Sequence, residues 1–155
     1  MEFILFPAAE LESRTDKNGL AAEILGEKAE KFVVKSAQGL SRFIPRKVRV
    51  EVWSENIPYI SHTADLLAEE LGVKRKFTKS IGQEDFDTLQ QMIQEHAPDK
   101  CVVVVGECPR ILQWCQQLLG YELPFNECSA AGFRMEDGKG ALLWFVRQTE
   151  LGRIR

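Results

Sequence analysis

The sequence predicts an α/β fold: a three-layer sandwich with a mostly parallel central sheet, helices on both faces and a C-terminal antiparallel hairpin. Short apolar runs of strand length alternate along the chain with longer segments whose apolar residues recur at helical spacing. Near the C-terminus, the turn sequence Asp137-Gly138-Lys139-Gly140 separates two strand-like segments. The chain has 155 residues and shows no linker or internal repeat, so residues 1–155 are expected to form one domain.

The expected strands differ in their apolar pattern. Phe3 to Phe6 and Cys101 to Gly106 are almost continuously apolar, which is typical of strands buried on both faces. Val48 to Trp53 alternates between apolar and polar residues. The other strands are expected at Val73–Phe77, where basic residues indicate a sheet edge, and in the hairpin at Ser129–Met135 and Ala141–Val146.

Helices are expected between these strands. Apolar residues at helical spacing run from Leu20 to Phe43, and Gly26 and Gly39 allow this run to form two pieces. A loop at residues 11–18, with a turn at Asp16–Gly19, precedes this run. Further helices are expected at Pro58–Leu71, Glu84–His96 and Pro109–Leu119, the last ended by Gly120.

The composition argues against several classes of function. A hydrophobic content of 45% and a charged content of 28% are ordinary for a globular protein. The net charge is −3 and no basic block is interleaved with aromatic residues, so nucleic acid is not an expected partner. We see no membrane span or signal sequence and expect a cytoplasmic location. The four cysteines lack metal-site spacing, so we expect reduced thiols and neither a metal nor a cofactor.

Three of the expected strands lead into loops at the sheet edge where ligands of open α/β sheets bind. The first leads into Pro7 to Glu12, which carries a proline, two alanines and two glutamates but little chemistry. The other two strand ends read Trp53-Ser54-Glu55-Asn56 and Val105-Gly106-Glu107-Cys108-Pro109. The candidate ligand contacts at these ends are Glu10, Ser54, Glu55 and Cys108.

The order of these strand ends resembles the histidine phosphatase superfamily, and within it the small SixA-like phosphohistidine phosphatases. Members open with a strand ending Arg-His-Gly. Their second strand ends Ser-Ser-Pro before a helix that carries Arg-Ala and Gln-Thr-Ala, and their third ends Gly-His, often before Glu-Pro. Ser129-Ala130-Ala131 and Leu143-Trp144 are similar to the family's closing hairpin. The resemblance covers nearly the whole chain and implies the phosphoglycerate mutase-like fold.

The resemblance implies that four phosphate-handling positions are substituted. Arg-His-Gly aligns with Pro7-Ala8-Ala9, so Ala8 stands in place of the histidine nucleophile. Tyr59, four residues before Thr63, stands in place of a phosphate-binding arginine, and Glu107 replaces the second histidine. The retained identities, which shape turns and helix starts, are Ser54, Thr63, Ala64, Gly106 and Pro109.

None of the substituted positions Pro7, Ala8, Tyr59 and Glu107 is cationic. Glu107, with Glu55 and Glu10 or Glu12 nearby, would make the crevice acidic. Like charges about 4 Å apart repel by about 1–4 kcal/mol. A phosphate dianion would therefore be repelled. We hypothesise a non-catalytic binding or regulatory module that acts on an unidentified small ligand or protein partner.

Several alternatives stay open. An active phosphatase or other hydrolase with a rebuilt site could use Cys108 or the glutamates. The pKa of the Cys108 thiol would fall at a helix start, although Glu107 opposes the thiolate. Glu55 and Glu107 could hold a metal or a cationic ligand only if folding brings them together. In a third alternative Tyr59 packs against Pro7 and fills the crevice, leaving function to an outer surface.

Three polar residues have simpler expected roles. We expect His62 and His96 to be solvated helix residues, with His96 in a last turn where a cation favours the helix dipole. Ser54 is expected to cap the second helix or its loop.

Overall fold

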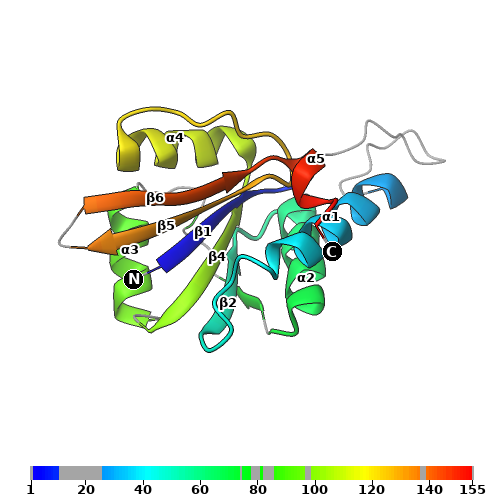
Figure 1. Ribbon diagram of the computed structural model, residues 1–155, viewed down its shortest axis with the longest axis horizontal. Coiled ribbons are helices and arrows are strands. Elements are labelled where there is room, and N and C mark those ends of the chain that lie inside the picture. The colour runs from blue at the N-terminus through cyan, green and yellow to red at the C-terminus, as the bar shows by residue number, and fades with distance from the viewer. Residues whose placement is uncertain are drawn as a thin grey trace.

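The computed structural model of the chain describes residues 2–10, 26–73, 75–77, 81, 86–96, 99–136 and 139–154. Several expected features lie outside these residues: the loop at residues 11–18 with Glu12, the turn at Asp16–Gly19, the helix start at Leu20, Glu84, and the Asp137-Gly138 pair. The elements (Figure 1) are β1 (Glu2–Pro7), α1 (Glu27–Leu40), β2 (Arg49–Ser54), α2 (Pro58–Leu71), β3 (Arg75–Phe77), α3 (Phe86–His96), β4 (Lys100–Gly106), α4 (Cys108–Leu119), β5 (Ala130–Glu136), β6 (Lys139–Val146) and α5 (Gln148–Leu151).

The strands form one sheet in the order β3-β2-β4-β1-β5-β6. The pairs β2–β3, β2–β4 and β1–β4 are parallel, whereas β1–β5 and β5–β6 are antiparallel. The predicted mixed sheet with a C-terminal hairpin is therefore confirmed. The short basic strand β3 lies at a sheet edge, as its composition indicated.

Helices cover both faces of the sheet, because alternate side chains of each strand point to opposite sides. On one face, Ile4 and Phe6 of β1 belong to a core shared with α1, α2 and α5. On the other face, Phe3 and Leu5 belong to a core shared with α3 and α4. This arrangement gives the predicted three layers (Figure 1).

The helix boundaries follow from local chemistry. Pro58 opens α2, where a proline needs no hydrogen-bond donor, and Gly72 ends it with φ +68°. Within the described residues α1 is continuous through Gly39, where a Cβ atom would lie 2.0 Å from the Leu151 carbonyl oxygen. Glycine therefore lets α5 pack closely against α1.

Two further expectations are tested by the fold. All four cysteines are free, as expected. No helix in the described part of the chain is both long and apolar enough to cross a membrane.

Candidate functional site

The fold brings the three predicted strand ends together. Pro7 at the end of β1 pairs with Gly106 at the end of β4, and Ser54 at the end of β2 pairs with Val105. The Ala8 amide donates a hydrogen bond to the Gly106 carbonyl at 2.8 Å, so the β1–β4 ladder continues past Pro7. The carboxyl ends of β1, β2 and β4 thus form one edge of the sheet. Because the sequence predicts a crevice at this edge, we call it the strand-end crevice.

Ala8 is only 3% exposed and its methyl group belongs to the core under α1 and α2. The neighbouring Ala9 amide donates to the Thr63 hydroxyl at 3.3 Å, and that hydroxyl donates to the Tyr59 carbonyl at 2.9 Å. Thr63 therefore fixes the first turn of α2 against the segment after β1. This contact gives a structural reason for the threonine at this position.

The negative charges of three carboxylates act on Tyr59. Its pKa is raised by burial and then by the negative charges of Glu107, Glu55 and Glu10. Burial also raises the pKa of the Glu55 carboxyl group, and repulsion from Glu107 adds to that shift. The glutamates predicted to make the crevice acidic therefore act on a common neighbour, and their charges add to the effect of burial in disfavouring ionisation of Tyr59.

Two residues missed by the sequence reasoning join this group. The positive charge of Arg110, in the first turn of α4, lowers the pKa of Glu55 and partly offsets its shift. The carboxylate of Glu127 accepts a hydrogen bond from the Glu10 amide at 2.6 Å. Arg110 directly follows Pro109, so extending the third predicted strand end by one residue would have found it. Glu127 is 117 residues from Glu10, and no local sequence pattern links the two.

Cys108 opens α4 and is half-buried. Its Sγ lies 3.6 Å from the Phe125 carbonyl oxygen, in donor geometry. Burial, and then the charge of Glu10, raise the pKa of its thiol. A protonated thiol is a poor nucleophile, so the helix start does not activate Cys108 here.

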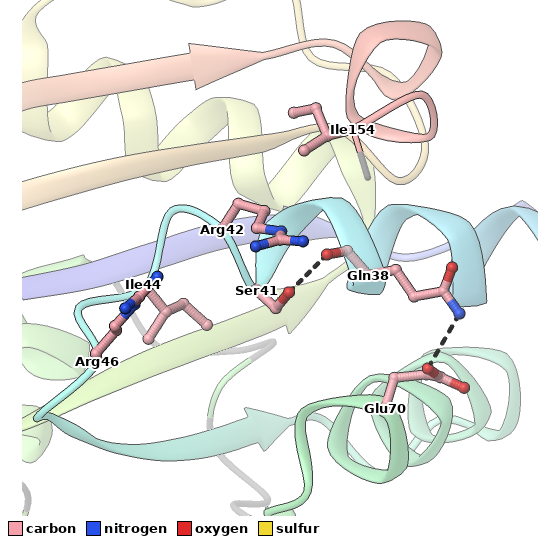
Figure 2. Close-up of a pocket in the computed structure, with 7 residues that line it drawn as sticks. All are labelled: Gln38, Ser41, Arg42, Ile44, Arg46, Glu70 and Ile154. Atoms are coloured by element: carbon pink, nitrogen blue, oxygen red, sulfur yellow. Dashed lines mark hydrogen bonds between the residues drawn. The ribbon is translucent and has the colours of Figure 1, made fainter.

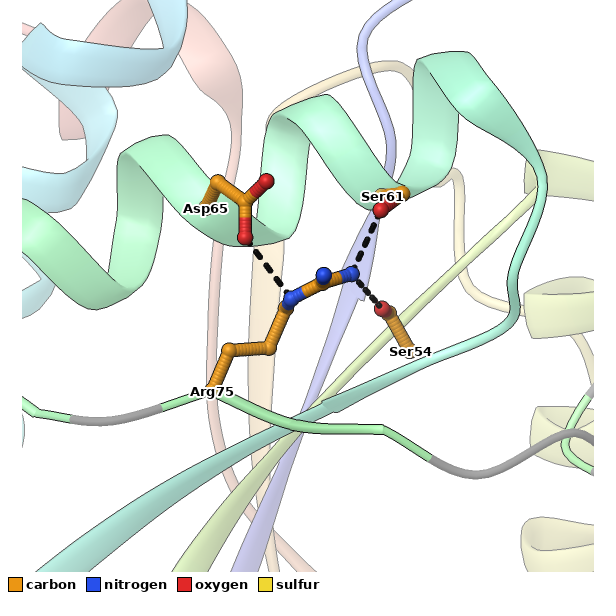
Figure 3. Close-up of polar contacts among 4 residues, drawn as sticks. All are labelled: Ser54, Ser61, Asp65 and Arg75. Atoms are coloured by element: carbon orange, nitrogen blue, oxygen red, sulfur yellow. Dashed lines mark hydrogen bonds and ion pairs between the residues drawn. The ribbon is translucent and has the colours of Figure 1, made fainter.

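Ser54 has a different environment from the one expected. Its side chain is fully buried, and its hydroxyl accepts a hydrogen bond from the Arg75 guanidinium at 3.3 Å. The guanidinium also donates to Ser61 and forms an ion pair with Asp65 at 2.7 Å (Figure 3). The N-cap of α2 is Ile57, so the expectation that Ser54 caps this helix is wrong. Ser54 joins β2 to β3 and α2 through Arg75.

Neither histidine belongs to the strand-end crevice as the sequence predicts it. His62 is half-buried, and its Nε2 lies 3.5 Å from the Glu30 carboxylate on α1, so it bridges two helices. His96 is exposed at the end of α3. Among the residues the structure describes, no group of three His, Cys, Asp or Glu residues is placed to hold a metal ion.

Comparison with known proteins identifies the fold. No family model matches the sequence, and no curated protein matches it. The structure is similar to that of the protein histidine phosphatase SixA complexed with tungstate, with TM-score 0.77 and 15% identity over 97% of this chain and 99% of that chain. It is also similar to a mycobacterial glucosyl-3-phosphoglycerate phosphatase with inorganic phosphate (TM-score 0.67, 14% identity, covering 95% of this chain and 98% of that chain).

A third similar structure is a phosphoserine phosphatase from Entamoeba histolytica in complex with 3-phosphoglyceric acid. Its TM-score is 0.68 at 13% identity, and the match covers 97% of this chain and 98% of that chain. At such identities the comparisons show the fold. The chain therefore has the phosphoglycerate mutase-like fold of the histidine phosphatases, which confirms the fold that the resemblance implied.

Proposed function

We propose that this chain is a SixA-like member of the histidine phosphatase superfamily that has lost phosphate handling and acts as a non-catalytic binding or regulatory module. The observation that carries the proposal is Ala8. A methyl group, buried at the end of β1, occupies the position that the resemblance assigns to the histidine nucleophile. Alanine has no lone pair to attack phosphorus, so the covalent step of such a mechanism has no acceptor.

The charge of the strand-end crevice supports the same proposal. Phosphoryl transfer needs fixed cations and hydrogen-bond donors around the phosphate oxygens. The positions aligned with those groups are Pro7, Tyr59 and Glu107, and the pKa of Tyr59 is raised partly by three carboxylates. Arg110 offsets the charge at Glu55 only in part. A ligand of this crevice would be neutral or cationic.

Several of the similar structures contain a phosphate group or a related oxyanion. One SixA neighbour was solved with tungstate and one mycobacterial neighbour with inorganic phosphate. An Entamoeba histolytica phosphoserine phosphatase variant with a histidine replaced by alanine was solved with phosphoserine. Loss of one histidine is therefore compatible with binding of a phosphate ester in that protein. For this chain, Ala8 alone would not exclude phosphate, so the proposal also depends on the negative charge of the strand-end crevice.

The alternative is an active phosphatase with a rebuilt site. Cys108 is the nucleophile that this alternative would use, but burial and Glu10 raise the pKa of its thiol. At neutral pH the thiolate is a minor species, which makes a cysteine mechanism unfavourable. This alternative makes a distinct prediction, namely that activity is lost on alkylation of Cys108.

The deciding experiment is a hydrolysis assay of the purified chain with a phosphohistidine peptide and with p-nitrophenyl phosphate. We expect no turnover above background for the wild type. Glu107→Gln and Cys108→Ser test the crevice, and Glu136→Gln, an exposed residue of β5, is the matched charge control. Turnover that Glu107→Gln or Cys108→Ser abolishes and Glu136→Gln leaves unchanged would overturn the proposal.

A further inference from the structure

A polar groove lies beside the C-terminal ends of α1 and α2. Its volume is about 580 Å³, within the range of about 300–1,000 Å³ typical of small-molecule sites. Four parts of the chain line it: the end of α1, the segment between α1 and β2, the last turn of α2, and the residues after α5 (Figure 2). The lining residues, which we call the arginine groove, are Gln38, Ser41, Arg42, Ile44, Arg46, Glu70 and Ile154.

The arginine groove shares no residue with the strand-end crevice. In the crevice, the negative charges of three glutamates act on Tyr59. The groove instead presents the two guanidinium groups of Arg42 and Arg46. Its charge is therefore opposite in sign to that of the crevice, and among the described residues that line it Glu70 alone is acidic. The two regions would select different ligands.

Helix capping does not explain the arginines. A cationic side chain after a helix often binds the last helical carbonyl groups. Here the amides of Ser41, Arg42 and Phe43 donate to the carbonyls of Ala37, Gly39 and Leu40. The Ser41 hydroxyl donates to the Gln38 carbonyl at 2.6 Å (Figure 2). The end of α1 is thus satisfied without either guanidinium group.

Ion pairing within the chain does not explain them either. Among the described residues, neither Arg42 nor Arg46 forms a salt bridge, although five other such pairs are present. The Glu70 carboxylate instead accepts a hydrogen bond from the Gln38 amide at 3.5 Å (Figure 2). Within the part of the chain that the structure describes, both guanidinium groups therefore keep their side-chain donors available for an external acceptor.

We propose that the arginine groove binds a small ligand that carries a phosphate or carboxylate group next to an apolar portion. Guanidinium groups match the planar geometry of these oxyanions and bind them with paired hydrogen bonds. Half-buried Ile44 and Ile154 supply apolar contact for the remainder of the ligand. Glu70 disfavours a second anionic group on its side of the groove, which selects a ligand with one charged end.

The test is an amide chemical-shift titration of the full chain with phenyl phosphate, benzoate, inorganic phosphate and benzylamine. We expect phenyl phosphate or benzoate to shift the amides of residues 41–46 saturably, with inorganic phosphate weaker and benzylamine without effect. The tighter of the two aryl anions identifies the oxyanion. Arg42→Gln and Arg46→Gln should each weaken that binding by about tenfold, as expected for lost charge-assisted hydrogen bonds.

Control variants distinguish binding of the anion at the groove from its general attraction to positive charge on the protein. Arg49→Gln removes the same charge three residues beyond Arg46, outside the groove, and should change the affinity less than about twofold. Ile154→Ser should reduce binding of the aryl anion towards that of inorganic phosphate, and Ile44→Ser repeats this test on the opposite side. Dispersed amide spectra confirm that each variant is folded.

Two results would overturn the proposal: no saturable shift at residues 41–46, or an equal loss of affinity in Arg49→Gln and the groove variants. Neither result bears on the strand-end crevice. Shifts centred on Ala8 and Tyr59 instead would contradict the proposed loss of phosphate handling there and would also count against the groove. The location of the shifts therefore keeps the two proposals distinguishable.

Discussion

At the scale of single residues, the strand-end crevice depends on a few side chains whose properties come from their neighbours. Ala8 contributes a buried methyl group and no reactive atom. Tyr59 contributes a phenol whose ionisation is disfavoured by burial and by the carboxylates of Glu107, Glu55 and Glu10. Its pKa therefore depends on the charge of the crevice as well as on burial.

We predict that Glu107→Gln lowers the pKa of Tyr59 towards its ordinary value, because Glu107 is the strongest charge acting on it. Tyrosinate absorbance measures the titration. Since the chain has 2 tyrosines, the experiment uses a Tyr121→Phe background, in which Tyr59 is the one tyrosine that titrates.

The raised pKa of Tyr59 also makes stability depend on pH. As the pH rises above 10.0 the phenol ionises first in the unfolded chain, so unfolding becomes more favourable.

Glu136→Gln is the control for that titration, because it removes one exposed carboxylate of β5 that is not among the charges acting on Tyr59. We expect it to leave the pKa of Tyr59 unchanged. An equal shift in both variants would show that net charge, rather than the arrangement at the strand ends, sets the phenol pKa.

At the scale of elements, α2 is fixed on two sides. Thr63 binds the segment after β1, whereas Ser61 and Asp65 bind Arg75 of β3 (Figure 3). The same guanidinium reaches buried Ser54 at the end of β2. Arg75 therefore joins a three-residue edge strand to both the central sheet and the helix that carries Tyr59.

We predict that Arg75→Gln lowers the free energy of unfolding by about 1–3 kcal/mol, because it removes charged hydrogen bonds and leaves the Ser54 hydroxyl without its guanidinium donor. Urea unfolding measures the change. Asp65→Asn removes only the partner that is 58% exposed and should cost less than about 1 kcal/mol. Equal effects of the two substitutions would mean that the ion pair, and not the buried hydroxyl, carries the contribution.

At the scale of the whole molecule, apolar patterning predicted the strands of the sheet and helices α1 to α4, but not the short helix α5. The runs at Phe3–Phe6 and Cys101–Gly106 became the central pair β1 and β4, because only strands buried on both faces are apolar throughout. The basic residues of β3 correctly indicated an edge. The resemblance then supplied the order of the strand ends, which the parallel pairing confirms.

The polar details could not be predicted in the same way, because they depend on contacts between distant segments. Ser54 looked like a cap from its place before α2, yet Arg75, 21 residues later, binds it within the sheet edge. Glu127 reaches the Glu10 amide across 117 residues. The arginine groove combines the end of α1 with Ile154, and no local pattern joins these residues.

Thiol reactivity gives a prediction at this scale, because the four cysteines sample different parts of the fold. Cys101, Cys115 and Cys128 are buried, whereas Cys108 is half-buried. Burial raises the pKa of Cys101 to about 12 and also raises the pKa values of Cys108, Cys115 and Cys128. With Ellman's reagent we expect Cys108 alone to react in the native protein, slowly and faster with rising pH, and all four thiols to react in denaturant.

Cys108→Ser should then remove the native reaction and leave three thiols that react only as the molecule unfolds. Their rate would follow the free energy of unfolding, because attack needs the thiol to be both exposed and ionised. If a second thiol reacts as fast as Cys108 in native protein, the core around it opens locally. Reaction of Cys128 would be the most informative such result, since its amide binds the Pro7 carbonyl beside Ala8 and its exposure would mean that the strand-end crevice itself opens.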